Sequence, residues 1–144
     1  MRTRLLTTLF ALLAGQTAQA AQSTAGCYQL VELFQPLGDA DSSHIELTSK
    51  PAHRKSFYPA DAKQIVAFND GKLPHVVEGY WHEEGDAVLL RIGGDFVGSI
   101  VRLHFTNSGL LKGDQTLYTD VIDENSREPR KIPTALRREP CPTA

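Results

Sequence analysis

The chain has 144 residues, of which 41% are hydrophobic and 8% aromatic, and this composition excludes an intrinsically disordered protein. Its 15 Lys and Arg stand against 17 Asp and Glu, which gives a formal net charge of −2. A chain without a basic excess lacks the concentrated positive surface of nucleic-acid-binding proteins, so we expect no nucleic acid among its partners. The length fits a single domain.

The first twenty residues have the order of a secretory signal peptide. A basic start with Arg2 and Arg4 precedes an uncharged run over 5–14, and Ala18-Gln19-Ala20 places small residues where signal peptidase reads them. The uncharged run is shorter than the roughly 20 residues that a membrane-spanning helix needs. We therefore expect cleavage after residue 20 and a periplasmic or secreted protein without a transmembrane segment. Cleavage also removes two positive charges.

The chain has two cysteines, Cys27 and Cys141. In an exported protein an even pair of thiols forms a disulfide, which here would join the start of the mature domain to its end. Two unpaired thiols are one alternative. A lipid anchor is another, because Thr24 to Cys27 resembles a bacterial lipoprotein box. Thr24 replaces the usual Leu, however, and lipidation would leave Cys141 without a partner, so the sequence favours the disulfide.

Short apolar or alternating runs, separated by turn residues, predict β-strands along most of the mature chain. These runs cover 27–34, 43–48, 76–82, 87–92, 96–105, 110–121 (one or two strands) and 131–138. Turn clusters recur about every dozen residues, which is typical of an all-β sandwich or barrel. We expect residues 21–144 to form one β domain that the terminal disulfide closes.

One segment departs from the strand pattern. In Pro59–Asn69 the apolar residues Ala62, Ile65, Val66 and Phe68 are close to helical spacing. A proline opens this segment, and an Asn-Asp-Gly sequence closes it, as at many helix ends. The sequence therefore predicts one short helix here.

The acidic turn over 83–86 predicts a hairpin with a four-residue connection. Its register places Trp81 opposite Val88 in the core. On the outer face it places Glu78 opposite Arg91, as an opposite-charge pair.

The next turn, Gly93-Gly94, permits two registers that differ by one residue and therefore exchange the faces of the following strand. One register directs Phe96 and Ile100 into the core, and the other directs Val97, Val101, Leu103 and Phe105 there. The second set is favoured because it is apolar apart from Ser99. It leaves Arg102 and His104 outside the core.

Together these features predict a small antiparallel up-and-down barrel or sandwich with one short helix. The disulfide would place the first and last strands side by side, as closure of a meander into a barrel requires. The pattern resembles lipocalin-like or avidin-like barrels. Over three residues, Gly26-Cys27-Tyr28 is also similar to the opening of the calycin fold.

The sequence lacks the common motifs of nucleophilic and phosphate-binding sites, and its five histidines lack dense metal-ligand spacing. His82 and His104 lie near the acidic turn over 83–86, where an acid–base or metal site is the alternative to exposed strand-end histidines. The carboxylates of 83–86 and of 120–124 are interpreted as solvated turn residues. We expect no enzyme activity, no cofactor and no bound metal.

Two regions are predicted to bind a ligand or partner. The first is the basic and aromatic stretch of residues 53–58, in the longest irregular connection, although its aromatic residues could instead pack the expected helix onto the barrel. The second is a basic strip formed by Arg127, Arg130, Lys131, Arg137 and Arg138, which either faces an acidic partner or envelope polymer or only balances the preceding acidic segment. The candidate binding residues are Arg54, Phe57, Tyr58, His82, Arg102 and His104.

The leading hypothesis is a monomeric, exported and non-catalytic binding protein. Its unknown small ligand or envelope-protein partner would bind in the barrel mouth or against residues 51–59. The alternative is a periplasmic inhibitor or immunity protein that blocks an enzyme's active site. A hydrolase that uses His82 or His104 with a carboxylate is a third reading.

Overall fold

The computed structural model describes residues 23–32, 42–53, 55–69, 73–119 and 131–143. The expected signal peptide, Arg54 and the acidic residues of 120–124 lie outside these ranges. The described residues form nine strands and no helix: β1 (Gly26–Glu32), β2 (Ser42–Pro51), β3 (Lys63–Asn69), β4 (His75–Val76), β5 (Gly79–Glu84), β6 (Ala87–Gly93), β7 (Val97–Phe105), β8 (Leu110–Thr119) and β9 (Lys131–Arg138). Nothing in these ranges is a helix long and apolar enough to cross a membrane.

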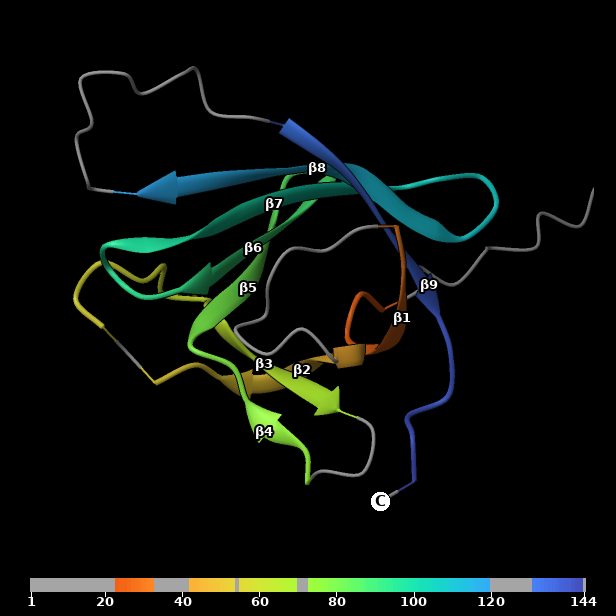
Figure 1. Cartoon of the computed structure of the whole chain (residues 1–144), viewed down its shortest axis with the longest axis horizontal. Coiled ribbons are helices and arrows are strands. Elements are labelled where there is room, and N and C mark those ends of the chain that lie inside the picture. Colours follow the sequence, from red (N-terminus) through yellow and green to blue (C-terminus); the bar gives the residue numbers. More distant parts are fainter. Residues whose placement is uncertain (1–22, 33–41, 54, 70–72, 120–130, 144) are drawn as a thin grey trace, which may run out of the picture.

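The strands form a closed antiparallel barrel of up-and-down type, as the sequence predicted (Figure 1). The sheet runs in the order β2-β1-β9-β8-β7-β6-β5-β3-β4, and an additional pairing of β2 with β3 closes it. The short strand β4 and the following β5 both pair with β3, so eight positions around the barrel are filled. Closure pairs the strand edges that would otherwise invite aggregation.

The two ends of the domain meet at the pairing of β1 with β9, where Tyr28 lies opposite Arg138. Just beyond this pairing, the sulfur atoms of Cys27 and Cys141 lie at disulfide-bond distance, with their Cα atoms 5.1 Å apart. The backbone N–H of Glu139 donates to the carbonyl of Cys27 at 3.0 Å. The predicted bridge between the terminal strands is thus confirmed by the geometry.

The expected helix over Pro59–Asn69 is wrong, because Lys63–Asn69 forms strand β3. Ile65, Ala67 and Asn69 are buried while the residues between them are partly exposed, which is the period of two of a strand. The apolar residues of this segment fit both the helical and the strand period. Pairing with the neighbouring strands selects the strand. β3 pairs with β2 on one side and with β4 and β5 on the other, which satisfies its backbone groups.

The predicted β5–β6 hairpin exists, but its connection has two residues instead of four. Glu84 pairs with Ala87 around Gly85, whose φ of 64° suits glycine at the first position of a two-residue hairpin turn. The register is therefore displaced by two residues. A displacement of two preserves the faces, so Trp81 still points into the core. The predicted pairing of Glu78 with Arg91 is wrong, since Tyr80 lies opposite Arg91.

The β6–β7 pairing is likewise displaced by two residues from the favoured register. The favoured inner face is right at its centre, where Val101 and Leu103 are fully buried. It is wrong at its ends, where Val97 and Phe105 are exposed, because β7 extends past the core on both sides.

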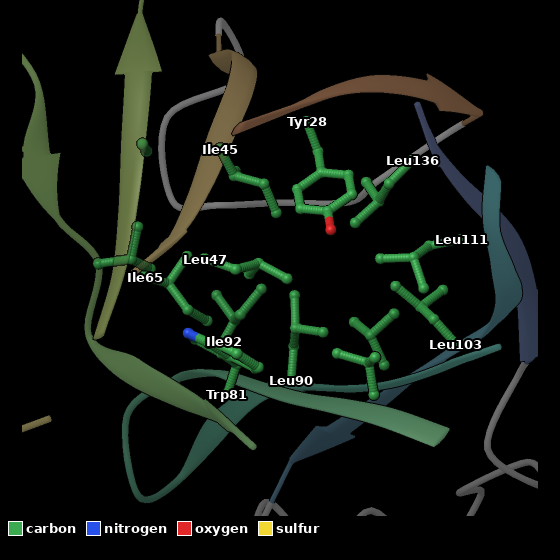
Figure 2. Packing of buried hydrophobic residues seen from close by; sticks show 14 residues of the cluster. Tyr28, Ile45, Leu47, Ile65, Trp81, Leu90, Ile92, Leu103, Leu111 and Leu136 are labelled. Atoms are coloured by element: carbon green, nitrogen blue, oxygen red, sulfur yellow. The ribbon is translucent and has the colours of Figure 1, made fainter. Parts of the chain in front are cut away.

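Buried side chains fill the centre of the barrel (Figure 2). They come from all eight strand positions and comprise Tyr28, Ile45, Leu47, Ile65, Ala67, Val77, Trp81, Val88, Leu90, Ile92, Val101, Leu103, Leu111 and Leu136. The polar ends of the two largest are satisfied by the backbone. The indole N–H of Trp81 donates to the carbonyl of Thr48 at 3.0 Å, and the hydroxyl of Tyr28 donates to the carbonyl of Thr24 at 2.6 Å.

Candidate functional site

The connection between β2 and β3, residues 52–62, folds back over the outside of the barrel, and we call it the flap. A hydrogen bond from the N–H of Ala52 to the carbonyl of Ala62 (2.9 Å) closes its base. A second, from Tyr58 to Lys55 (3.0 Å), forms a turn near its tip. The flap, yellow in Figure 1, thereby reaches β5 and the turn between β6 and β7.

A pocket of about 300 Å³ lies between the flap and the barrel wall. The flap contributes Ala52, His53, Lys55 and Tyr58, and the wall contributes Gln64, Val76, Val77, Glu78 and Gly79. The pocket exists because the chain leaves the regular ladder between β4 and β5. There the N–H of Val77 donates to Ile65 of β3 at 2.9 Å, while the carbonyl of Glu78 accepts from Gly93 of β6 at 2.8 Å.

Lys55 carries the main charge at the rim of the pocket. Its ammonium lies 2.7 Å from the carboxylate of Glu78 and 3.6 Å from that of Asp95. The hydrogen bond to Glu78 raises the pKa of Lys55. These two exposed ion pairs attach the flap to the residue before β5 and to the β6–β7 turn, and water and salt weaken such attachments.

Aromatic contacts hold the middle of the flap on β5. The ring of Tyr58 lies 4.5 Å from that of Tyr80, centroid to centroid, and Tyr80 lies 5.8 Å from the ring of His82. Tyr80 is only 6% exposed although it points outward from the barrel, because Tyr58 covers it. Burial also raises the pKa of Tyr58. Of these rings, that of Tyr58 lines the pocket.

Phe57 points to a different neighbour, Arg91 of β6. The guanidinium carbon of Arg91 lies 4.9 Å from the ring centroid of Phe57 and 5.2 Å from that of Tyr118 on β8. The Nε–H of Arg91 donates to the hydroxyl of Tyr118 at 3.3 Å, and this hydroxyl donates to the carbonyl of Gly94 at 2.8 Å. We call the Phe57–Arg91–Tyr118 arrangement the arginine clamp.

The structure brings some of the predicted binding residues together and separates the others. Phe57 and Tyr58 lie side by side on the flap, with their rings 5.1 Å apart, and Tyr58 lines the pocket. They pack the flap onto the barrel in place of the expected helix. Arg102 lies away from the pocket and pairs with Glu84 on the outer face, as expected for a residue outside the core. Arg54 is outside the described residues.

The two candidate histidines do not meet. His82 lies on β5 and His104 on β7 with β6 between them, which places their strands roughly 9–10 Å apart. His82 is 3.6 Å from Asp61, and His104 is 3.6 Å from Asp86, a turn residue whose side chain is 94% exposed. Each imidazole therefore has its own carboxylate, and the structure assembles no shared acid–base site from them.

The basic strip is also divided. On β9, Lys131 and Arg137 are exposed, whereas Arg138 closes one end of the barrel. Its guanidinium lies 5.8 Å from the ring of Tyr28 and donates to the carbonyl of Ala25 at 2.8 Å. Residues 127 and 130 lie outside the described part of the chain. Arg138 is therefore a structural residue.

One group of potential metal ligands occurs in the described ranges. Cys27, Glu46 and Cys141 have ligand atoms within 4.8 Å of one another. Because the two sulfurs are at bonding distance from each other, the thiolates that a metal would need are consumed by the disulfide. This group is therefore interpreted as the disulfide with a neighbouring carboxylate.

Sequence reasoning identified the flap but missed Arg91 and Tyr118 as its partners. The sequence did place Arg91 on the outer face of its hairpin, and an outward-facing arginine is a candidate partner for the aromatic residues of the flap. Its contact with Tyr118 requires the β6–β7–β8 registers, which place Arg91 opposite Ile100 and Tyr118 opposite Gly98.

Comparison with known proteins found no matching family model, no matching curated protein and no matching solved structure.

Proposed function

We propose that this chain is an exported, non-catalytic binding protein that holds a small ligand in the pocket beneath the flap. The observation that carries the proposal is the position of the pocket. Side chains occupy the centre of the barrel, while the outer wall and the flap border an open pocket of about 300 Å³. This volume is at the lower end of the range for small-molecule sites.

The lining of the pocket supports a ligand with an apolar body and one polar end. Val76, Val77 and the ring of Tyr58 offer apolar contact, whereas Gln64 and His53 offer hydrogen-bonding groups. Small-molecule sites commonly combine mainly apolar walls with a few polar groups that orient the ligand. His82 and His104, the histidines considered for acid–base chemistry, lie outside the lining and each faces a separate carboxylate, so we assign the pocket to binding.

Export is supported by two independent features of the chain. The leader has the order of a signal peptide, and the terminal cysteines lie at disulfide distance, which suits an oxidising compartment. A small exported domain that carries its ligand on the outside of a filled barrel can retain a well-packed core.

The test uses the oxidised mature protein and the fluorescent apolar anion 1-anilinonaphthalene-8-sulfonate as the probe. Val76→Phe enlarges a side chain of the pocket wall and should weaken probe binding at least tenfold. Val31→Phe, an equally conservative change at an exposed valine of β1, is the matched control and should bind like the unaltered protein. Equal binding by all three proteins would refute the pocket as the ligand site.

The filled barrel with its exposed flap residue also favours a second candidate, an inhibitor or immunity protein that inserts into an enzyme. Phe57 is 45% exposed at the flap surface, and aromatic side chains of this kind commonly anchor protein interfaces. Chemical cross-linking to envelope proteins distinguishes the candidates. An inhibitor should yield one defined adduct that Phe57→Ala abolishes, while a small-ligand carrier should yield none.

A further inference from the structure

The arginine clamp has a donor set that the rest of the chain does not use. Arg91 has five N–H groups, and its Nε–H donates to Tyr118. Within the described ranges, the guanidinium of Arg91 makes no other side-chain hydrogen bond. No described carboxylate lies within ion-pair distance of it. Glu78 and Asp95, which lie on the same side of the barrel as the flap, pair with Lys55. Among the described residues, the fork formed by the Nη atoms therefore has no carboxylate partner.

The clamp is preorganised, because two aromatic rings and one hydrogen bond hold the guanidinium. Tyr118 crosses β7 at Gly98, where a Cβ would lie only 2.5 Å from the tyrosine oxygen. The missing side chain at Gly98 therefore makes room for the ring. Phe57 contacts the guanidinium from the flap, so Arg91 loses little further freedom when it binds an acceptor.

The surface around the clamp is apolar and exposed. Ile100 lies directly opposite Arg91 in the β6–β7 register and is 42% exposed, and Phe57 is 45% exposed. An arginine stacked on aromatic rings beside an exposed aliphatic side chain has the composition of an interface hot spot. Such a centre combines apolar burial with a directional charge.

We propose that the arginine clamp is a docking site for a segment of a partner protein that presents a Glu or Asp side chain next to an apolar side chain. The carboxylate accepts two parallel hydrogen bonds from the Nη atoms of Arg91. The apolar side chain covers Ile100 and the exposed part of Phe57.

The charge of the chain distinguishes this partner from a polyanion. Acidic residues exceed basic ones over the whole sequence, and the neighbouring basic side chains Lys55 and Arg102 are already paired with carboxylates. A single guanidinium that pairs with no described carboxylate and is bordered by apolar groups matches one carboxylate in an apolar context. It does not match a phosphate backbone, which requires several unpaired cations. This site lies outside the pocket lining and does not depend on the proposed small-ligand function.

The experiment is a titration of the oxidised mature protein, followed by ¹⁵N–¹H NMR that includes the Nε–H signal of Arg91. The probes are two terminally blocked tripeptides, Phe-Glu-Leu and Phe-Gln-Leu, and sodium acetate. The glutamate peptide should shift the Arg91 signal together with the amides of Phe57 and Ile100, with a Kd at least tenfold below that of the glutamine peptide. The comparison isolates the carboxylate, since the two peptides differ only in that group.

Variants locate the interaction. Arg91→Gln should abolish binding of the glutamate peptide, whereas Arg102→Gln, a matched change on the same outer face, should leave the Kd unchanged. If Arg91→Gln alters the overall spectrum, Ile100→Glu replaces it: this variant supplies a competing carboxylate beside Arg91 and should also abolish binding. Equal Kd values for the two peptides, binding that survives Arg91→Gln or Ile100→Glu, or acetate binding as tight as peptide binding would overturn the proposal.

Discussion

The disulfide between the terminal strands should stabilise the barrel mainly by restricting the unfolded chain. Cys27 and Cys141 are separated by 114 positions, and the chain-entropy relation for a loop of this size gives about 4.8 kcal/mol at room temperature. This value is an upper limit, because residual structure in the unfolded chain reduces it. Typical domains are stable by roughly 5–15 kcal/mol, so removal of the bridge should cost a large share of the total.

The folded barrel itself should change little without the bridge. β1 and β9 remain neighbours through their own ladder, which includes the pairing of Gln29 with Arg137. We therefore predict that the reduced protein keeps its closed sheet but unfolds at a much lower urea concentration. Trp81, the one tryptophan of the sequence, is 1% exposed in the core, so its fluorescence reports the unfolding of the whole barrel.

The design separates the cross-link from the packing of its sulfur atoms. Cys27 is buried, so the double variant Cys27→Ala, Cys141→Ala removes core volume as well as the bridge. The reduced unaltered protein keeps both sulfurs and isolates the cross-link. A loss of stability below about 1 kcal/mol in the reduced protein, with unchanged urea dependence, would refute the unfolded-chain argument. Loss of amide protection along β1 and β9 before unfolding would refute the claim that the ladder closes the barrel alone.

Three further perturbations test the core, the clamp and the ionisable groups. Trp81→Phe leaves a cavity and an unpaired carbonyl at Thr48, and it should lower the free energy of unfolding by about 2–4 kcal/mol. Urea unfolding followed by circular dichroism measures this change, and a loss under about 1 kcal/mol would contradict the tight packing of Trp81. Gly98→Ala places a Cβ 2.4 Å from the carbonyl oxygen of Ile92 and should lower the free energy of unfolding by roughly 1–3 kcal/mol. Gly94→Ala is the control, because its Cβ meets no atom closer than 3.7 Å, and it should be nearly neutral. Equal effects of the two variants would refute the close approach at Gly98. Burial raises the pKa of Tyr28 above its usual value of 10.0, so the folded state binds that proton more tightly than the unfolded state. The contribution of Tyr28 to stability should therefore be constant below about pH 10 and be lost as the pH rises further. Tyr28→Phe should reduce this alkaline loss, and an unchanged alkaline slope in the variant would contradict the assignment.

The parts of the fold that follow from local pattern were predictable from the sequence. Alternation around Trp81 and Val88 identified the inner face, and this face survived a register error because the displacement was two residues. The export signal made a bond between Cys27 and Cys141 the natural expectation, and this bond implied adjacent terminal strands. Each of these inferences depends on residues that are close in sequence or on a single covalent constraint.

The parts that were missed depend on contacts between distant segments. The apolar residues of Lys63–Asn69 suit a helix as well as a strand, and only pairing with β2, β4 and β5 selects the strand. The length of the turn at Gly85 decided the hairpin register, and turn length is weakly specified when four polar residues are adjacent. The contact of Phe57 with Arg91 could not be predicted from the sequence. It joins the flap to strand β6, and β6 is not a hydrogen-bonded neighbour of β2 or β3, the strands that the flap connects.

The distribution of stabilising contacts explains why both proposed sites involve the flap. The barrel wall is fixed by strand pairing all around the sheet and by a filled core, whereas the flap is held by an exposed ion pair, stacked rings and a few backbone hydrogen bonds. Contacts of the second kind cost little to exchange for contacts with a ligand. Phe57 and Tyr58 are neighbours in the chain, yet one packs in the arginine clamp and the other lines the pocket. A rigid barrel can therefore present two chemically different surfaces through a single short connection, without altering the packing on which its own stability depends.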